Sequence, residues 1–228
     1  MRVLNLYAGI GGNRKLWGDD IEVTAVELDP NIAKVYQDFY PKDTVIVGDA
    51  QKYLLENYMN FDFIWASPPC PTHSRARFPR VGVEYPNGNK YDAVYPDMSL
   101  YQIILLLDNY FKGFWIVENV IPFYTPLIAP SVNIGRHYYW SNYDIPKIEI
   151  EDNRIHGDIL RSSTMYGCDL NGYGSIGDKR MMLRNMVNPQ VGLYLFECAK
   201  MALDSSLKPA HYVLNLLDYM EDEAVCSL

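Results

Sequence analysis

Short apolar runs alternate with amphipathic segments along residues 2–120, and this alternation limits the possible folds more than any other feature of the chain. The runs predict β-strands at residues 2–9, 21–30, 44–50, 61–67 and 114–120. Between them, apolar spacing predicts helices at residues 13–20, 31–40, 52–58 and 98–111. Almost continuous apolar runs are typical of parallel strands that are buried on both faces. We therefore expect an α/β fold with a doubly wound, mostly parallel sheet.

The pattern weakens after a further strand, which we predict at residues 136–143. Residues 143–183 are polar, contain several glycines and show no long apolar period. Residues 188–203 have the amphipathic spacing of a helix, and residues 211–220 predict another. The chain therefore divides into a main domain at 1–142, a small polar region at 143–183, and C-terminal helices at 184–228 that return to the main domain.

Charge and cysteine usage narrow the class of protein. The formal net charge of −8 disfavours nucleic-acid binding, although Arg75, Arg77, Arg80 and Lys90 form a local basic group. None of the four cysteines forms a C-x-x-C pair, so we predict neither a metal site nor a disulfide framework. The chain has no run of 18 apolar residues and no signal peptide at its start. We expect a soluble, cytoplasmic protein with no membrane partner.

Polar and glycine residues follow the predicted strands at their carboxyl ends, where doubly wound sheets bind ligands. Gly9 to Gly12 follow the first strand, Glu27 ends the second, and Asp49 follows the third. A glycine turn lets a ligand approach the backbone, an acid at the second strand can bind ribose hydroxyls, and Asp49 can accept from an adenine amino group. Together they predict an adenosine ligand, while the glycine turn alone is equally consistent with helix–strand packing. The turn lacks G-x-G-x-x-G spacing, which disfavours a nicotinamide dinucleotide.

Cys70 follows the fourth predicted strand, and Glu118 lies within the fifth. Most cysteines are small buried hydrophobic residues, but Cys70 is flanked by Pro69 and Pro71 and precedes a basic loop. Prolines fix φ and preorganise a nucleophile. Glu118 is a charge inside an apolar strand, which indicates either catalysis or a structural hydrogen bond.

The order of these motifs resembles that of the cytosine-C5 DNA methyltransferase family. The first three family motifs resemble LNLYAGIGG, AVELDP and VGDA, and the nucleophile motif resembles SPPCPTHS. The glutamate, arginine and last motifs resemble ENV, GRHYYW and RNMVNPQVGLYLFECA. The resemblance implies a Rossmann-like domain that binds S-adenosylmethionine, yields S-adenosylhomocysteine and uses no metal. It implies DNA as the partner, with a flipped cytosine attacked at C6 by Cys70 while Glu118 binds N3.

The resemblance also assigns roles to individual residues. It implies Cys70, Glu118 and Arg136 as catalytic residues. Implied cofactor contacts are Tyr7, Ala8, Gly9, Gly11, Gly12, Glu27, Leu28, Asp49, Ala50, Leu100 and Asn185. Implied substrate contacts are Pro69, Ser74, Arg75, Arg77 and Asn119. The main domain would be catalytic, and residues 143–183 would be a much reduced target-recognition region that reads a short site.

The chain departs from the family pattern at several places. Tyr138 stands where a second arginine is usual, and Arg184 replaces a glycine before Asn185, at the methionine end of the cofactor pocket. The recognition region is also very short. Three other functions stay open: an RNA (tRNA) cytosine-C5 methyltransferase, a non-catalytic DNA-binding or regulatory relative, and a dehydrogenase. A monomer and a dimer that supplies extra DNA contacts are both consistent with the sequence.

Overall fold

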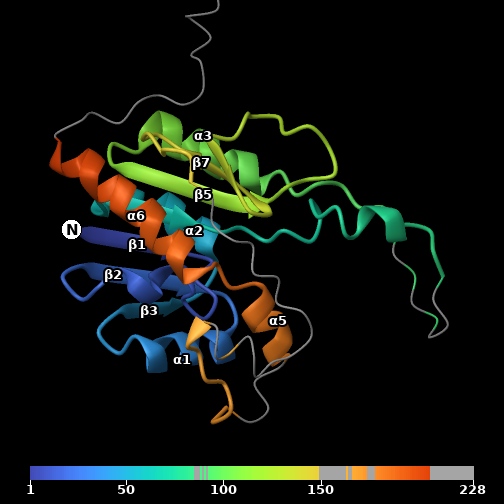
Figure 1. The fold of residues 1–228 in the computed structure, drawn as a ribbon, viewed down its shortest axis with the longest axis horizontal. Coiled ribbons are helices and arrows are strands. Elements are labelled where there is room, and N and C mark those ends of the chain that lie inside the picture. Colours follow the sequence, from blue (N-terminus) through green and yellow to red (C-terminus); the bar gives the residue numbers. More distant parts are fainter. Residues whose placement is uncertain are drawn as a thin grey trace, which may run out of the picture.

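A central seven-stranded sheet is present in the residues that the computed structural model describes, which are 1–84, 88, 90, 92–148, 163, 166–173 and 178–205 (Figure 1). The strands are β1 (Arg2–Leu6), β2 (Glu22–Glu27), β3 (Thr44–Val47), β4 (Phe63–Ala66), β5 (Phe114–Val120), β6 (Val132–Ile134) and β7 (His137–Ser141). Their order across the sheet is β3-β2-β1-β4-β5-β7-β6. Strands β1 to β5 run parallel, and β7 pairs antiparallel with both β5 and β6.

The direction in which strands are added reverses between β1 and β4. The chain runs outward from β1 to β2 and β3, then returns to add β4 and β5 on the other side of β1. Leu6 and Ala66, the last residues of β1 and β4, pair in register. The turn after β1 and the segment after β4 therefore begin side by side at the topological switch point, where doubly wound sheets bind ligands.

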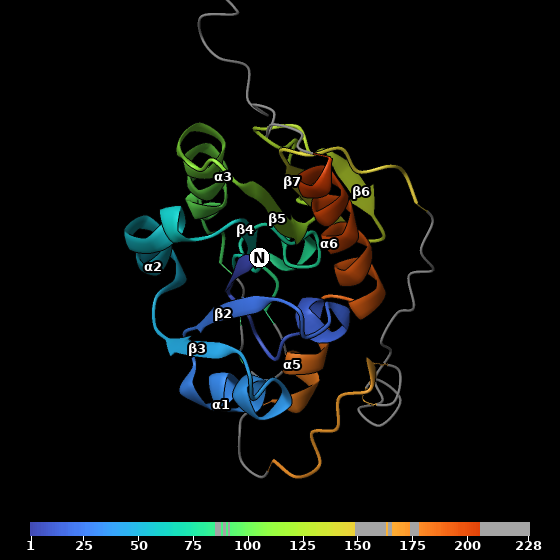
Figure 2. The same ribbon diagram turned by 90° about the vertical axis from the view of Figure 1, so that its left-hand side faces the viewer.

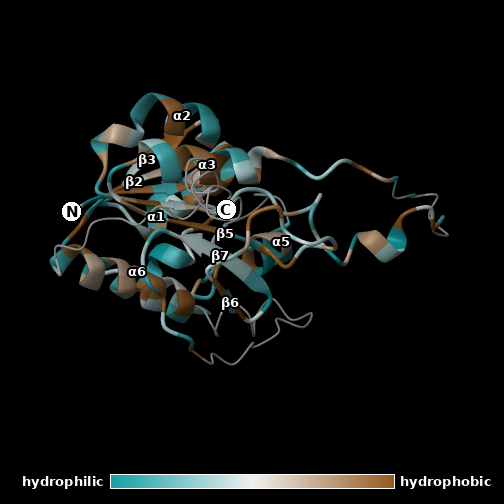
Figure 3. Ribbon diagram, turned by 90° about the horizontal axis from the view of Figure 1, so that it is seen from above, coloured by the Kyte–Doolittle hydropathy of each residue, from teal (hydrophilic) through white to brown (hydrophobic). Residues whose placement is uncertain are grey.

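Helices cover both faces of the sheet (Figures 1 and 2). They are α1 (Pro30–Phe39), α2 (Ala50–Asn57), α3 (Ser99–Tyr110), α5 (Lys179–Arg184) and α6 (Pro189–Asp204), with a 3₁₀ helix at Asn13–Leu16. One hydrophobic cluster joins α2 and α3 to one face, and another joins α6 to the opposite face. Helices α2, α3 and α6 carry both hydrophobic and hydrophilic residues, as helices with one buried face should (Figure 3).

Capping residues explain where three helices begin. Asp29 accepts from the N–H groups of Asn31 and Ile32 and is followed by Pro30, and Asp49 accepts from the N–H of Lys52. For α6, Asn188 accepts from the N–H of Gln190 and precedes Pro189. A side-chain acceptor at the N-cap followed by proline at the first helical position is a strong start signal. Two of these caps follow β2 and β3 directly, so the acids at these strand ends also start helices.

The expected doubly wound, mostly parallel sheet is confirmed, and the second half of the chain adds two elements that the sequence did not predict. Strand β6 has three residues, too few to show an alternating pattern, and α5 is a six-residue helix inside the region taken as polar. The helix predicted at 211–220 lies outside the described residues. Within the described part of the chain, none of the helices has the length and apolar character to cross a membrane. The three-part domain division stays a prediction.

A buried ion pair joins the 3₁₀ helix after β1 to the residue before β3. Arg14 donates from Nε and Nη2 to Asp43 at 2.9 and 3.0 Å, and their side chains are 5% and 2% exposed. The Tyr36 hydroxyl donates to the same carboxylate at 2.9 Å. Removing one partner of such a pair leaves an uncompensated buried charge.

We expect Asp43→Ala to lower the free energy of unfolding by about 3–5 kcal/mol. Urea unfolding followed by circular dichroism measures this change. Lys42→Ala is the matched control, because it removes an ion pair with Asp19 whose side chains are 74% and 68% exposed, and it should change stability little. Equal effects of the two substitutions would contradict the assignment of stability to the buried pair.

Candidate active site

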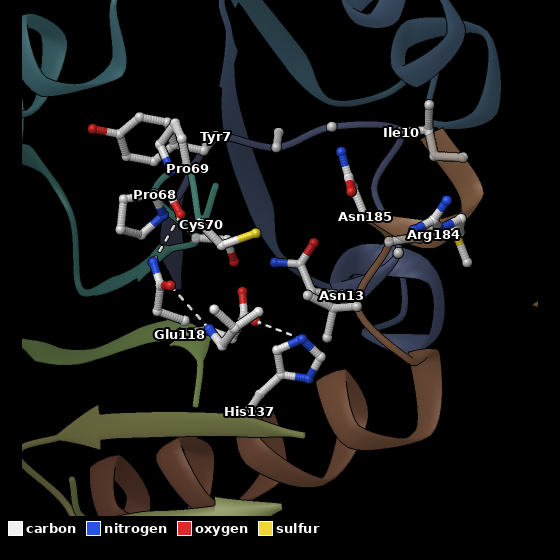
Figure 4. A pocket seen from close by; sticks show the side chains of 18 of the residues that line it. Tyr7, Ile10, Asn13, Pro68, Pro69, Cys70, Glu118, His137, Arg184 and Asn185 are labelled. Atoms are coloured by element: carbon white, nitrogen blue, oxygen red, sulfur yellow. Dashed lines mark hydrogen bonds and ion pairs between the residues drawn. The ribbon is translucent and has the colours of Figure 1, made fainter. Parts of the chain in front are cut away.

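A cavity of about 1300 Å³ opens at the carboxyl ends of the parallel strands. Its wall runs from the turn after β1, past the ends of β2 and β3, to the segment after β4 and the end of β5. Helix α5 and the residues after it form the other side (Figure 4). Most single-ligand sites enclose about 300–1000 Å³. The cavity is therefore large enough for a nucleoside cofactor together with a base.

The glycine turn, residues 9–12, has open backbone at Gly9 and tightly packed backbone at Gly12. Gly9 has φ +56°, and a Cβ there would meet nothing within 4 Å, so it presents bare backbone to the cavity. A Cβ on Gly12 would instead lie 2.1 Å from Cγ of Met186 and 2.5 Å from the carbonyl oxygen of Val187. Tyr7 has φ 56° as well, a conformation that costs a non-glycine residue free energy and that concentrates at functional sites. The turn thus serves both packing and ligand access.

The acids at the ends of β2 and β3 keep acceptor capacity for a ligand. Glu27 accepts from the N–H of Gly9 at 2.9 Å and from the N–H of Asp29 at 3.0 Å, which ties the glycine turn to the end of β2. A carboxylate offers about four lone-pair positions, so Glu27 and the helix cap Asp49 can each accept further bonds. Burial, and then the charges of Asp49 and Asp97, raises the pKa of Tyr7 to about 12. Tyr7 is therefore a neutral ring beside these acids.

The backbone before Cys70 is tied to the strands on both sides of β4. The Ser67 N–H donates to the carbonyl of Leu6 at 3.3 Å, and the Asn119 amide donates to the carbonyl of Pro68 at 3.0 Å (Figure 4). The prolines around Cys70 restrict φ further. These constraints hold the thiol at the cavity wall, and they give Asn119, the residue after Glu118, a structural role.

The free Cys70 thiol is a weak acid in this environment. Burial raises its pKa, and the negative charge of Glu118 raises it further. The thiol and the carboxylate line the same cavity, and the charge of one shifts the pKa of the other. Such coupled groups concentrate at functional sites.

Glu118 faces the cavity because of the pairing between β5 and β7. The antiparallel register places Glu118 opposite Tyr139, and Val120 opposite His137. Side chains two residues apart share a face of a sheet, and all four residues line the cavity. Glu118 is 9% exposed, and its Oε1 lies 3.5 Å from Nε2 of His137 (Figure 4).

The structure brings most of the predicted site residues to one cavity. Its wall includes Tyr7, Ala8, Gly9, Gly12, Glu27, Leu28, Asp49, Ala50, Pro69, Cys70, Glu118, Asn119, Arg136 and Asn185. The predicted site residues that do not line it are Gly11, Leu100, Ser74, Arg75 and Arg77. Leu100 is 3% exposed and packs with the core beneath α3, and a Cβ on Gly11 would meet the Tyr40 ring at 2.2 Å. Leu100 and Gly11 therefore have packing roles in this structure.

The basic segment after Cys70 lies outside the cavity wall. Ser74 forms an isolated β-bridge with Pro122, and Nε of Arg75 donates to the Pro122 carbonyl at 2.9 Å. The rings of Phe78 and Phe123 stack with centroids 5.0 Å apart. The segment packs against Pro122 and Phe123 after β5 and then extends away from the sheet (Figure 1). We call residues 74–84 the arm. Substrate contacts by Ser74, Arg75 and Arg77 stay predictions.

The polar residues of the cavity that sequence reasoning missed include His137 and Asn13. Asn13 donates to Asn5 at 2.8 Å, and Asn5 donates back at 3.3 Å, both deep in the structure. A buried amide needs a partner, so Asn5 inside an apolar strand was the available signal for Asn13. For His137 the signal was alternation along β7, which places it on the face that Tyr139 shares.

The residues present fit an adenosine-type cofactor. Backbone is open at Gly9 and at Gly48, where a Cβ would again meet nothing within 4 Å. Glu27 and Asp49 offer acceptors beside them, and Tyr7 offers a ring face. In the described part of the chain, no three His, Cys, Asp or Glu residues gather as a metal site would require.

A model of the C-5 cytosine-specific DNA methylase family matches residues 1–121, which is more than half of the 228 residues. The chain belongs to the C-5 cytosine-specific DNA methylase family. Family membership supports methyl transfer as the chemistry of this methylase, with cytosine C5 as the acceptor. The match includes the glycine turn, Cys70 and Glu118. Arg136, His137 and α5 lie beyond the matched residues.

Solved structures similar to this methylase have low sequence identity. A hypothetical protein of Thermus thermophilus is 17% identical with a TM-score of 0.41, over 65% of this chain and 75% of that one. DNMT2 of Spodoptera frugiperda is 20% identical with a TM-score of 0.40, over 69% and 56%. The methyltransferase EhMeth of Entamoeba histolytica is 15% identical with a TM-score of 0.38, over 71% and 59%. No curated protein matches the chain. TM-scores of this size say nothing about substrate.

Proposed function

We propose that this methylase transfers a methyl group from S-adenosylmethionine to C5 of cytosine in DNA. The observation that supports it best is the Cys70 thiol and the Glu118 carboxylate on the wall of one cavity with the glycine turn (Figure 4). Cytosine C5 is a poor nucleophile until a group has added to C6, so the reaction needs a thiol and a group that stabilises charge at N3. Both are present here.

Cys70 acts as the nucleophile. Its sulfur forms a bond to C6 while the C5–C6 π electrons shift toward C5 and N3. The raised pKa of the thiol means that Cys70 is protonated before substrate binds. Passage of the thiol proton to Glu118, and from Glu118 to N3, keeps the charges balanced as the S–C6 bond forms. While Glu118 carries this proton it is neutral, so its charge does not oppose the developing negative charge on the sulfur.

Residues of the glycine turn and the strand ends hold the cofactor. S-adenosylmethionine, when bound, supplies an electrophilic methyl group on its sulfonium sulfur. Tyr7 would stack on the adenine, Asp49 would accept from its amino group, and Glu27 would accept from the ribose hydroxyls. Cys70 leaves as a thiolate once C5 carries the methyl group and its proton has passed to water, which restores the C5–C6 double bond. The proton held at N3 then returns through Glu118 to the Cys70 thiolate, which regenerates the thiol.

A cytosine in duplex DNA must leave the stack to reach Cys70, so the proposal includes base flipping. Arg75 and Arg77 on the arm would contact phosphates, with residues 143–183 as the reduced recognition region.

Purified protein should be incubated with tritiated S-adenosylmethionine and mixed-sequence duplex DNA or tRNA. We expect label in 5-methyldeoxycytidine from DNA. Label in tRNA alone would replace the DNA proposal with the RNA one, and no label in either would overturn both.

Arg184 provides a test of the cofactor pocket. It lines the cavity beside Asn185 and Ile10, away from Tyr7 (Figure 4). If Tyr7 holds the adenine, the amino-acid tail of the cofactor reaches this side, where a guanidinium can bind its carboxylate. We expect Arg184→Gly to weaken S-adenosylhomocysteine binding by about 1.5–3 kcal/mol in calorimetry.

Binding of 5′-methylthioadenosine, which lacks that tail, should not change in Arg184→Gly. Arg180→Ala, one helical turn earlier on the same cavity wall, is the matched control. An equal loss for both ligands would contradict the carboxylate contact.

A further inference from the structure

His137 is the side chain that the structure places against the carboxylate of Glu118. Nε2 of His137 lies 3.5 Å from Oε1, and the side chains are 33% and 11% exposed. A carboxylate this buried is stabilised by a polar partner. Among the described residues, His137 is the only basic side chain within ion-pair distance of Glu118. Figure 4 shows Glu118 between Cys70 and His137.

The sheet fixes this arrangement. His137 begins β7 and pairs with Val120, two residues along β5 from Glu118 and on the same face. Arg136, one residue earlier, lies before the strand, and its carbonyl accepts from the N–H of Ile121 at 3.1 Å. The register of β5 and β7 therefore places His137 within reach of Glu118. His137 is the residue after Arg136, the predicted catalytic arginine.

We propose that His137 is a positioning residue that holds one oxygen of Glu118 and leaves the other for the base. The proposal rests on the proposed function and adds a residue to its site. At 3.5 Å the contact is an ion-pair distance and slightly long for a hydrogen bond. Catalytic hydrogen bonds often shorten when substrate binds. A glutamate side chain has several rotatable bonds, so a fixed oxygen removes conformations in which the carboxylate misses N3.

The test compares His137→Leu, which removes both ring nitrogens, with His137→Gln, which keeps an N–H donor at similar reach. We expect His137→Leu to lower kcat for cytosine methylation about 10–100-fold, because small misplacements at a catalytic group have effects of this size. His137→Gln should recover most of the loss. KM for DNA, S-adenosylhomocysteine affinity and the thermal midpoint should stay near wild type in both variants.

A second measurement separates action through Glu118 from an independent effect. His137→Leu placed in a Glu118→Gln background should cause no further loss of kcat, because the group that it positions is already absent. Multiplicative losses in the double variant would overturn the proposal. So would wild-type kcat in His137→Leu, or equal loss in His137→Leu and His137→Gln. Absence of methyl transfer by the wild-type protein would overturn the proposed function and this proposal together, whereas the other outcomes overturn only the role of His137.

Discussion

Cys70→Ala is expected to abolish methyl transfer, with a loss of kcat of about a thousandfold or more, because removing a covalent nucleophile removes the reaction path itself. Cys70→Ser should be nearly as inactive, since a neutral hydroxyl is a much weaker nucleophile than a thiolate. Calorimetry should show unchanged S-adenosylhomocysteine binding in both variants. The assay is incorporation of tritiated methyl groups into mixed-sequence DNA.

The matched control for this prediction is Cys198→Ser. Cys198 is a free cysteine on α6, 8% exposed and packed in the core rather than on the cavity wall. It should keep activity at temperatures where the variant is folded. Comparable activity in Cys70→Ala and wild type would rule out the nucleophilic mechanism.

Glu118→Gln is expected to lower kcat by about 10²–10⁴-fold, the usual contribution of a group that transfers a proton in the transition state. S-adenosylhomocysteine affinity should change little, because the carboxylate acts on the base. A collapse of cofactor affinity instead would make Glu118 a cofactor residue and contradict its assigned role.

The same substitution should make Cys70 more acidic. Burial is the main cause of the raised pKa of Cys70, and the charge of Glu118 is the second. Glutamine removes the second cause and leaves the first, so the pKa should fall toward its ordinary value without reaching it. The rate of Cys70 alkylation by iodoacetamide, followed by peptide mass spectrometry, should therefore rise at a lower pH in Glu118→Gln than in wild type. An unshifted profile would show that the two groups are not coupled.

The sequence predicted the elements whose signal is local. Strands β1 to β5 are continuous apolar runs, and Cys70 and Glu118 follow or end such runs, so the rule for strand carboxyl ends was enough to bring them together. Both residues line the same cavity.

The parts that sequence reasoning missed depend on tertiary packing. Leu100 packs in the core, because the orientation of α3 on the sheet decides which of its residues face the cavity, and its expected contact with a cofactor stays a prediction. His137 was missed because only the register of β7 against β5 shows that it reaches Glu118. Helix α5 has six residues, and its position against the cavity follows from contacts rather than from its own pattern.

The most direct test of the account is trapping of the covalent complex on DNA. A mixed-sequence duplex made with 5-fluorocytosine can accept the Cys70 attack and the methyl group, but it has no C5 proton to lose, so the S–C6 bond should persist. Mass spectrometry of the protein incubated with this DNA and S-adenosylmethionine should show a methylated nucleotide on the Cys70 peptide, and no adduct with Cys70→Ala. Methyl transfer to ordinary DNA without any adduct at Cys70 on the fluorinated duplex would contradict the account.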